Sequence, residues 1–410
     1  MSSAKEDWTG RTFEVEVGPV AHGGHFVARH EGRVLFVRHA LPGERVVASV
    51  YEDNGGSFCR ADAVEVLTPS PDRVEPPCPF SGPGLCGGCD FQHVSWDAQR
   101  ELKAQVVREQ LARLGKIERD VVVEALPGGP LEWRTRIRMA VDGDGRPGFR
   151  GTRSHDVIPV DHCVISRPGM VEAVADRRWR AQELTIVQDG DGNRHVGEVR
   201  SRHTVRRAGT GTAVETAANR KWRVSADGFW QVHPAAADTF ATVVGEWIAA
   251  EPGQRAWDLY GGAGLFASVL ARQVGETGSV LVVESFAGAV EDGRRNLRRM
   301  PQIEWAVGKV ERLVTRPLPV EDPHVVVLDP PRKGAGKVVV AEVARRRPRR
   351  VVYVACDPAA LARDLAEFTV QGYRLTDLRA FDAFPMTHHV ECIALMEPET
   401  SGDGVSVESP

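Results

Sequence analysis

The second half of the chain alternates short apolar runs with helix-like runs, and this alternation limits the fold more than any other feature. The apolar runs include VLVVE (280–284), HVVVLD (324–329) and VVYVAC (351–356). Each is followed by a polar turn and an amphipathic stretch. Continuous apolar strands that alternate with helices form a parallel sheet covered on both faces. The sequence therefore predicts an α/β domain with a doubly wound, Rossmann-like sheet whose ligands bind at the carboxyl ends of the strands.

The N-terminal part has a different pattern. Residues 11–69 contain short alternating strands broken by glycine turns, which predict a small antiparallel β-barrel. The proline-rich segment TPSPDRVEPP (68–77) predicts a hinge. We expect residues 70–221 to form a central α+β domain, residues 222–398 the sheet domain, and residues 399–410 a disordered tail.

Composition excludes some classes of protein. The chain has 410 residues and a formal net charge of −4, so the molecule as a whole is not a basic nucleic-acid binder. Local arginine-rich runs at 194–207 and 345–350 still have the charge to hold nucleic-acid phosphates. No apolar run approaches the roughly 20 residues that span a bilayer, and no secretory signal pattern begins the sequence. We expect a cytoplasmic protein without membrane contact.

A glycine loop, DLYGGAGLF (258–266), lies between the first apolar strand and a helix. Its glycines let the backbone approach a ligand at a helix N-terminus. Glu284 ends the next strand about 20 residues on, where a carboxylate accepts hydrogen bonds from ribose hydroxyls. The third glycine of the dinucleotide pattern is absent, since Phe266 and Ala267 stand there. The pattern favours S-adenosylmethionine over a dinucleotide, although a glycine loop can also serve packing alone.

Two further side chains are expected at the same edge of the sheet. The run DPPR places Asp329 there, and its two prolines form a stiff ledge against which a flat base can lie. Cys356 ends another strand. A cysteine in such a place is more often a packing residue. Asp357 and Pro358 suit the start of the next helix, whose N–H groups would lower the thiol pKa, whereas the charge of Asp357 would raise it.

Three of the seven cysteines are clustered in the run CPFSGPGLCGGC (78–89). Their C-x7-C-x2-C spacing suggests a metal centre that needs one more thiolate. Cys163 is the best available fourth ligand, because Cys59 falls in the predicted barrel and Cys392 in the last strand. Four thiolates suit either a [4Fe-4S] cluster or a zinc ion, and the spacing does not separate the two.

Together these motifs resemble the RNA uracil-5-methyltransferase family, in particular its 23S ribosomal RNA branch with an N-terminal TRAM barrel and a [4Fe-4S] cluster. The matched segments are CGGCDFQH, DHC, GFWQVHP, DLYGGAGLF, LDPPRKG, VYVACDPAALARDL and HHVECIALM. The resemblance covers residues from about 11 to 398. Two departures are that Ala355 and Asp357 flank the cysteine where the family usually has Ser and Asn, and that the first cysteine spacer is longer than in many members.

The resemblance implies a role for particular residues. Cys356 would be the nucleophile and Glu391 the base. The methyl-donor contacts would be Gln231, Tyr260, Glu284 and Asp329, and the cluster ligands would be Cys78, Cys86, Cys89 and Cys163.

These roles fit the chemistry that the reaction needs. Carbon 5 of uracil is too weak a nucleophile to take a methyl group unaided, and thiolate attack on carbon 6 converts the ring into a reactive enolate. A base must then remove the proton on carbon 5. We therefore expect S-adenosylmethionine-dependent methylation of a uridine in RNA, with 23S rRNA as the expected partner of a monomeric enzyme. The alternatives are a tRNA uridine-5-methyltransferase and a non-catalytic, metal-stabilised RNA-binding protein.

Overall fold

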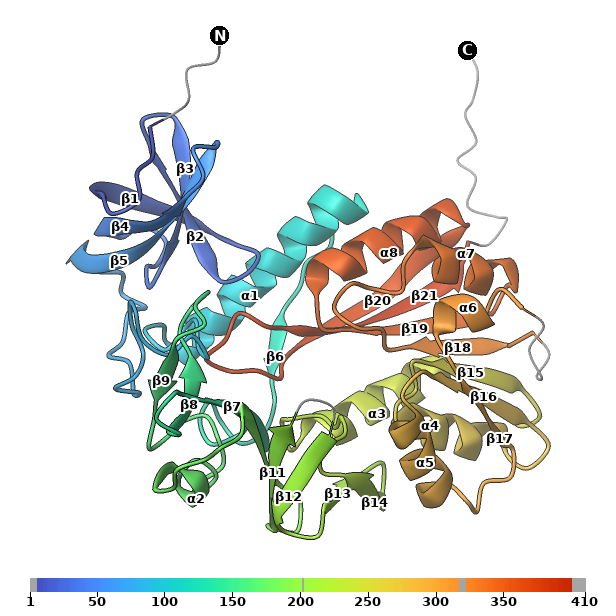
Figure 1. The fold of residues 1–410 in the computed structure, drawn as a ribbon. Coiled ribbons are helices and arrows are strands. Elements are labelled where there is room, and N and C mark those ends of the chain that lie inside the picture. The colour runs from blue at the N-terminus through green and yellow to red at the C-terminus, as the bar shows by residue number, and fades with distance from the viewer. Residues whose placement is uncertain (1–5, 201–202, 317–321, 400–410) are drawn as a thin grey trace, which may run out of the picture.

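The computed structural model describes residues 6–200, 203–316 and 322–399 of the chain (Figure 1). Almost all of the predicted C-terminal tail lies outside these residues. The described part contains a small barrel, a central antiparallel sheet and a large mixed sheet with helices on both faces.

The N-terminal barrel is closed by five strands in the order β1-β2-β3-β5-β4. Alternate side chains point into its core, as the burial pattern of β1 shows. One prediction needs correction, because β3 and β5 pair in parallel while the other neighbours are antiparallel. The strands are β1 (Thr12–Ala21), β2 (His25–His30), β3 (Arg33–Arg38), β4 (Arg45–Asp53) and β5 (Phe58–Thr68).

The central part contains a six-stranded antiparallel sheet in the order β12-β11-β10-β7-β8-β9, with a separate hairpin β13–β14. A short helix α2 (Glu172–Ala175) packs on it through Val174. The strands are β7 (Arg136–Val141), β8 (Pro147–Arg150), β9 (Val157–Pro159), β10 (Glu183–Gln188), β11 (Arg194–Arg200), β12 (His203–Ala208), β13 (Thr212–Ala217) and β14 (Arg220–Ser225).

The large sheet has eight strands in the order β17-β16-β15-β18-β19-β21-β20-β6. The five strands from β17 to β19 are parallel, and β21 then inserts antiparallel to β19. This is the predicted doubly wound arrangement. The strands are β6 (Val123–Ala125), β15 (Arg255–Leu259), β16 (Ser279–Glu284), β17 (Ile303–Val307), β18 (Val325–Leu328), β19 (Arg350–Ala355), β20 (Tyr373–Asp382) and β21 (Glu391–Pro398).

Helices cover both faces of this sheet because its strands are apolar on both sides. Val351 and Tyr353 of β19 join one hydrophobic core, and Val352 and Val354 join the other. Helices α1, α7 and α8 pack in the first core, and α3 and α4 pack in the second. The helices are α1 (Trp96–Gln110), α3 (Ala236–Ile248), α4 (Leu265–Val274), α5 (Ala287–Asn296), α6 (Val310–Leu313), α7 (Lys337–Arg345) and α8 (Pro358–Val370).

Helix α1 and strand β6 precede the central sheet in sequence but pack on the large sheet. Strand β6 pairs with β20 and forms the edge of the sheet, and a π-helical turn (Leu111–Gly115) follows α1 against α8. The buried ammonium of Lys103 in α1 lies 2.5 Å from the carboxylate of Asp382 at the end of β20. The domain that carries the large sheet therefore includes residues from both sides of the central sheet.

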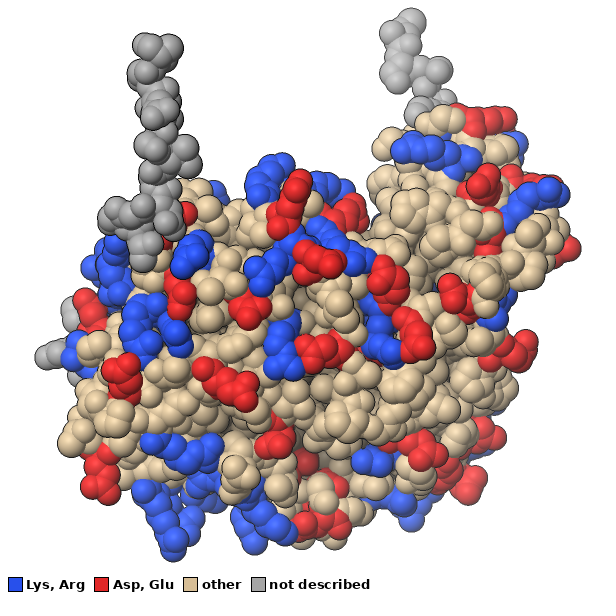
Figure 2. Space-filling view, turned by 180° about the vertical axis from the view of Figure 1, so that it is seen from behind, with Lys and Arg blue, Asp and Glu red and all other residues tan. Residues whose placement is uncertain are grey.

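The surface is mixed in charge. Figure 2 shows Lys and Arg side chains interspersed with Asp and Glu over most of the rear face. Among the described helices, none has the length and apolar character that a membrane span requires.

Candidate active site

Strand direction brings five of the predicted site residues to one edge of the large sheet. Strands β15, β16, β18 and β19 are parallel, so their carboxyl ends meet. Strand β21 is antiparallel to β19, with Cys392 opposite Ala355, and it therefore starts at this same edge. The side chains that follow or begin these strands here are Tyr260, Glu284, Asp329, Cys356 and Glu391.

Gln231 comes from a different place in the fold. It is half-buried in the segment between β14 and α3. The next residue, Val232, accepts hydrogen bonds at 2.9 Å from both the N–H and the hydroxyl of Thr135, which fixes this segment against the central sheet. Within the described residues, no hydrogen bond joins the Gln231 side chain to the strand-end residues, so its predicted role stays a prediction.

The glycine loop has little space for side chains. A Cβ on Gly261 would lie 2.6 Å from Val282 Cγ1, and one on Gly264, where φ is +86°, would lie 2.7 Å from Leu297 Cδ1. The loop backbone also orients Glu284, whose carboxylate accepts hydrogen bonds from the N–H groups of Gly262 at 3.1 Å and Phe286 at 2.7 Å. The loop is thus packed closely against the strand that carries the predicted ribose-binding carboxylate.

Two buried carboxyl groups beside this loop have raised pKa values. Burial, and then the charges of Asp329 and Glu284, raise the pKa of Asp258 to about 7, and the hydrogen bond from the N–H of Ala267 opposes this rise. Burial and then the charge of Glu284 raise the pKa of Asp329 to about 7. Asp258 Oδ1 and the buried hydroxyl of Tyr260 have no hydrogen-bond partner among the described residues. Unpartnered polar atoms and crowded carboxylates favour a polar ligand that carries a positive charge.

Cys356 and Glu391 lie at the same edge of the sheet, at the ends of the neighbouring strands β19 and β21. Burial, and then the nearby carboxylates of Glu391 and Asp329, raise the pKa of the Cys356 thiol to about 12, while Arg332 opposes this rise. Burial and Asp329 also raise the pKa of Glu391 well above its usual range, again opposed by Arg332. Arg332 is therefore the cation that faces both groups.

Asp357 caps the N-terminus of α8, as the sequence suggested. Its Oδ1 accepts the N–H of Ala360 at 2.8 Å at the start of α8. Its Oδ2 lies 3.1 Å from Nε2 of His22, in the turn between β1 and β2 of the barrel. Burial raises the pKa of Asp357, but hydrogen bonds from His22 and Ala360 outweigh burial and lower it. Among the causes of the raised Cys356 pKa, the charge of Asp357 is the smallest.

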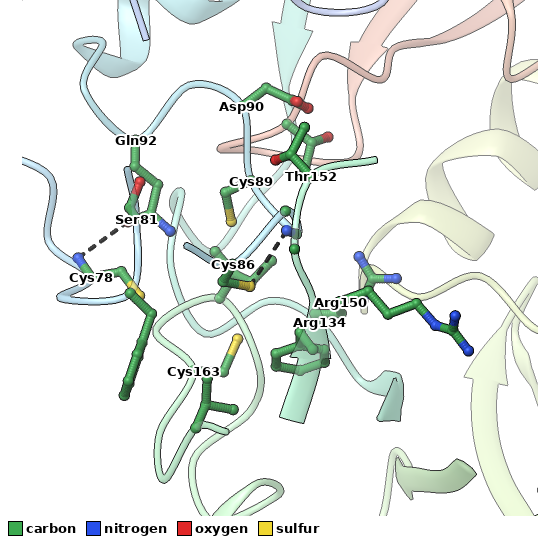
Figure 3. Close-up of a pocket in the computed structure, with 18 of the residues that line it drawn as sticks. Cys78, Ser81, Cys86, Cys89, Asp90, Gln92, Arg134, Arg150, Thr152 and Cys163 are labelled. Carbon is green, nitrogen blue, oxygen red and sulfur yellow. Dashed lines mark hydrogen bonds between the residues drawn. The ribbon is translucent and has the colours of Figure 1, made fainter. Parts of the chain in front are cut away.

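The four predicted metal-ligand cysteines line one cavity of about 470 Å³ (Figure 3). They come from the loop before α1 and from the loop after β9. The N–H of Gly88 lies 3.4 Å from Cys86 Sγ, and a Cβ on Gly87 would lie 2.8 Å from the backbone nitrogen of Thr152. Figure 3 shows the sulfur atoms of Cys86, Cys89 and Cys163 directed toward a common space. Cys59 and Cys392 are buried elsewhere.

The lining of this cavity includes an arginine beside the cysteines. The described residues contain no group of three or more His, Cys, Asp or Glu side chains close enough to hold a single metal ion. Arg134 lines the cavity, faces Cys89 and Cys163, and has no carboxylate partner among the described residues. A guanidinium in this position would balance thiolate charge. The metal centre itself stays a prediction.

Two residues of the site were not assigned from the sequence. Arg332 appeared there only as the last residue of the run DPPR, and nothing local marked its contact with His389 at 3.1 Å. His22 carried no signal because it lies 335 residues from Asp357. The arginine-rich run 345–350, which the sequence suggested for binding phosphates, leads into β19 at the opposite edge of the sheet. There Arg350 pairs with Glu397 at 3.0 Å.

Comparison with known proteins agrees with this geometry. The family model of tRNA (Uracil-5-)-methyltransferase matches residues 306–399, which include Asp329, Cys356 and Glu391. The TRAM domain model matches residues 8–64, the five-stranded barrel. A model of protein-L-isoaspartate O-methyltransferase matches residues 230–310, which contain the glycine loop.

Relatives resemble the chain over nearly its whole length. An uncharacterized RNA methyltransferase of Streptomyces coelicolor is 46% identical, over 96% of this chain and 94% of the relative. The 23S rRNA (uracil(1939)-C(5))-methyltransferase of Alkalilimnicola ehrlichii is 32% identical, over 94% and 97%.

A solved structure shares the fold. It is the Pyrococcus abyssi tRNA (uracil-54, C5)-methyltransferase in complex with S-adenosyl-L-homocysteine, with a TM-score of 0.71, 22% identity, and coverage of 94% of this chain and all of that one. The chain described here belongs to the RNA (uracil-5-)-methyltransferase family, whose members use S-adenosylmethionine to methylate RNA.

Proposed function

We propose that this enzyme methylates carbon 5 of a uridine in 23S rRNA through a covalent bond between Cys356 and carbon 6 of the base. The observation that carries the proposal is the meeting of Cys356, Glu391 and Arg332 at the carboxyl edge of the sheet. Similarity to a 23S rRNA enzyme over nearly the full length supports the choice of RNA.

In this mechanism Cys356 attacks first. Its pKa of about 12 keeps the thiol protonated at neutral pH in the free protein, so the proton must leave to solvent as the sulfur reacts. The new bond joins sulfur to carbon 6, and the electrons of the carbon 5–carbon 6 bond move to form the enolate. Arg332, the cation that faces the thiol, favours the thiolate that attacks.

S-adenosylmethionine supplies an electrophilic methyl group on a positively charged sulfur when it is bound. The chain has groups that fit it: Glu284 for the ribose hydroxyls, and the unpartnered hydroxyl of Tyr260 for a further polar contact. Asp329, whose pKa is about 7, would ionise more readily beside the positive sulfur. We propose that Gln231 completes this set.

Glu391 acts after methyl transfer. Its carboxylate takes the proton from carbon 5, the carbon 5–carbon 6 double bond forms again, and the Cys356 thiolate leaves. Because burial raises the pKa of Glu391, the carboxylate must first be ionised, and Arg332 favours this form. The removal of the carbon 5 proton by Glu391 should therefore become faster as pH rises.

The test uses RNA that contains 5-fluorouridine together with the methyl donor. A base cannot remove fluorine from carbon 5 in the way that it removes a proton, so the Cys356 thiolate cannot be eliminated. A covalent protein–RNA complex should therefore accumulate and resist denaturation. Cys356→Ala should form none, and Glu391→Gln should trap the complex on ordinary uridine RNA. An undiminished complex with Cys356→Ala would refute the nucleophile.

The choice of RNA has its own test. We expect 5-methyluridine in 23S rRNA fragments and none in tRNA transcripts under the same conditions. Methylation of tRNA alone would instead favour the same reaction on tRNA, the substrate named for the Pyrococcus abyssi enzyme. Binding of RNA without methylation of any RNA would favour a non-catalytic RNA-binding protein.

We also propose that Cys78, Cys86, Cys89 and Cys163 hold a [4Fe-4S] cluster. The shared cavity, the N–H of Gly88 near Cys86, and the Arg134 guanidinium, which has no carboxylate partner among the described residues, support this proposal. Protein purified without oxygen should be brown and contain about four iron atoms per chain. Stoichiometric zinc would contradict it.

We propose that residues 11–69 form the RNA-binding TRAM domain, that residues 70–221 carry the cysteine-bearing central domain apart from α1 and β6, which pack on the large sheet, and that residues 222–398 form the rest of the methyltransferase domain. We further propose that the enzyme is a cytoplasmic monomer, which sedimentation of the purified protein would test.

A further inference from the structure

The tip of the β1–β2 hairpin joins the barrel to both halves of the proposed catalytic pair. On one side, His22 Nε2 lies 3.1 Å from Asp357 Oδ2, beside Cys356. On the other side, Gly24 packs against the loop that leads to Glu391. A Cβ on Gly24 would lie 2.9 Å from His388 Cβ, and φ is +78° there, so only glycine fits.

A second set of contacts holds this hairpin in place. The carboxylate of Asp90 accepts hydrogen bonds from Arg38 of the barrel at 3.0 Å and from the His388 backbone at 3.0 Å, and it lies 2.6 Å from the His388 ring. Asp90 is nearly inaccessible, so these bonds are shielded from water. The barrel is therefore connected to the methyltransferase domain at the nucleophile side and at the base side.

Capping of α8 uses only one carboxylate oxygen of Asp357, so it does not explain the contact between the other oxygen and His22. Oδ1 of Asp357 already satisfies the N–H of Ala360, and an uncharged asparagine would do this equally well. The second oxygen is directed to His22. Asp357 is about one quarter exposed and His22 about two fifths exposed, so the pair is open enough for His22 to be replaced without creating a cavity.

We propose that His22 is a positioning residue for the methyl-transfer site: by holding Asp357 it fixes the start of α8 and the Cys356 thiol relative to the barrel that binds RNA. This inference rests on the proposed function, because Cys356 matters here as the nucleophile. It assigns to the barrel a role in catalysis as well as in RNA binding.

Steady-state methylation tests this role in full-length protein. His22→Ala should lower kcat about fivefold, or about 1 kcal/mol, with the KM for RNA within twofold. His22→Gln, whose amide N–H can still donate to Asp357, should recover most of the loss. Glu14→Gln breaks an exposed ion pair within the same barrel and should change nothing.

A double-mutant cycle shows whether His22 acts through Asp357. In the Asp357→Asn background, His22→Ala should have no further effect on kcat. An equal loss in both backgrounds, or a change in KM alone, would overturn the positioning role.

Alkylation of Cys356 by iodoacetamide supplies a readout that needs no methylation. We expect His22→Ala to slow it about threefold, because the freed Asp357 carboxylate opposes the thiolate more strongly, and to have no effect in the Asp357→Asn background. Absence of this coupling refutes the inference even if the wild-type protein methylates no RNA. Absence of methylation with the coupling intact refutes only the proposed function.

Discussion

At the scale of single residues, burial raises the pKa of the carboxyl groups at the sheet edge above the values of exposed side chains. Asp258 has no accessible surface. One of its oxygens accepts a hydrogen bond from the N–H of Ala267 at 2.8 Å, while the other has no partner in the part of the chain that the structure describes. Its pKa of about 7 means that folding makes ionisation harder than in the unfolded chain. A ligand with a positive charge would relieve this cost.

Asp258→Asn should therefore stabilise the ligand-free protein increasingly as pH rises. Between pH 5 and pH 7 the unfolded Asp258 is ionised while the folded one keeps its proton, so the wild-type free energy of unfolding falls over this range. The stabilisation by Asp258→Asn should grow by about 3 kcal/mol from pH 5 to pH 8. Urea unfolding at both pH values measures it, and a difference that stays constant with pH would contradict the raised pKa.

Arg332 offers a second residue-scale prediction. It is the cation that faces both the Cys356 thiol and the Glu391 carboxyl. Arg332→Ala should raise the pKa of Cys356 and slow its alkylation at pH 8 by about tenfold. Arg332→Lys, which keeps the charge, should lose less. Equal rates in Arg332→Ala and wild type would show that this charge does not reach the thiol.

At the scale of elements, α1 joins two hydrophobic cores. Its residues Ala104 and Val107 pack with the large sheet, while Leu102 and Val106 pack with the barrel. Lys103 lies between them and bonds both the Asp382 carboxylate at 2.5 Å and the carbonyl of Phe384 at 3.0 Å. This buried ion pair fixes α1 at the end of β20.

Lys103→Met should destabilise the protein by about 3 kcal/mol, because the change keeps the volume but leaves the Asp382 carboxylate buried without its cation. Chemical unfolding measures the loss. Lys337→Met is a suitable control, since Lys337 is almost fully exposed and its pair with Glu367 is long, at 3.8 Å. A loss below 1 kcal/mol for Lys103→Met would contradict the stabilising role of this ion pair.

At the scale of the whole molecule, the domains do not follow one another as separate units of sequence. Residues 96–125 cross from the barrel to the large sheet, cover α8 and add the edge strand β6 before the chain enters the central sheet. The barrel also reaches the active edge through His22. The three parts are therefore held together by buried contacts as well as by the chain.

A fragment of residues 222–399 should fail to fold cooperatively, even though it contains seven of the eight strands of the large sheet. It lacks α1 and β6, so the apolar face of α8 and the edge of β20 would be exposed to water. Near-ultraviolet circular dichroism during thermal unfolding is the measurement. A sharp transition close to that of the full chain would contradict the expectation.

The sequence by itself determined which segments form strands and helices in the large sheet, because local periodicity and continuous apolar runs encode burial. It also placed Tyr260, Glu284, Asp329 and Cys356 at one edge, since each follows a strand of a parallel sheet. The glycine loop and the barrel were equally visible in local pattern.

Only the tertiary structure decided the rest. It inserted β21 beside β19, which brings Glu391 to Cys356, and it brought His22 to Asp357 across 335 residues. It also placed the arginine-rich run 345–350 at the opposite edge, where Arg350 pairs within its own domain. Such contacts, and the pKa values that burial sets, depend on which elements pack together, and no local spacing in the sequence carries that information.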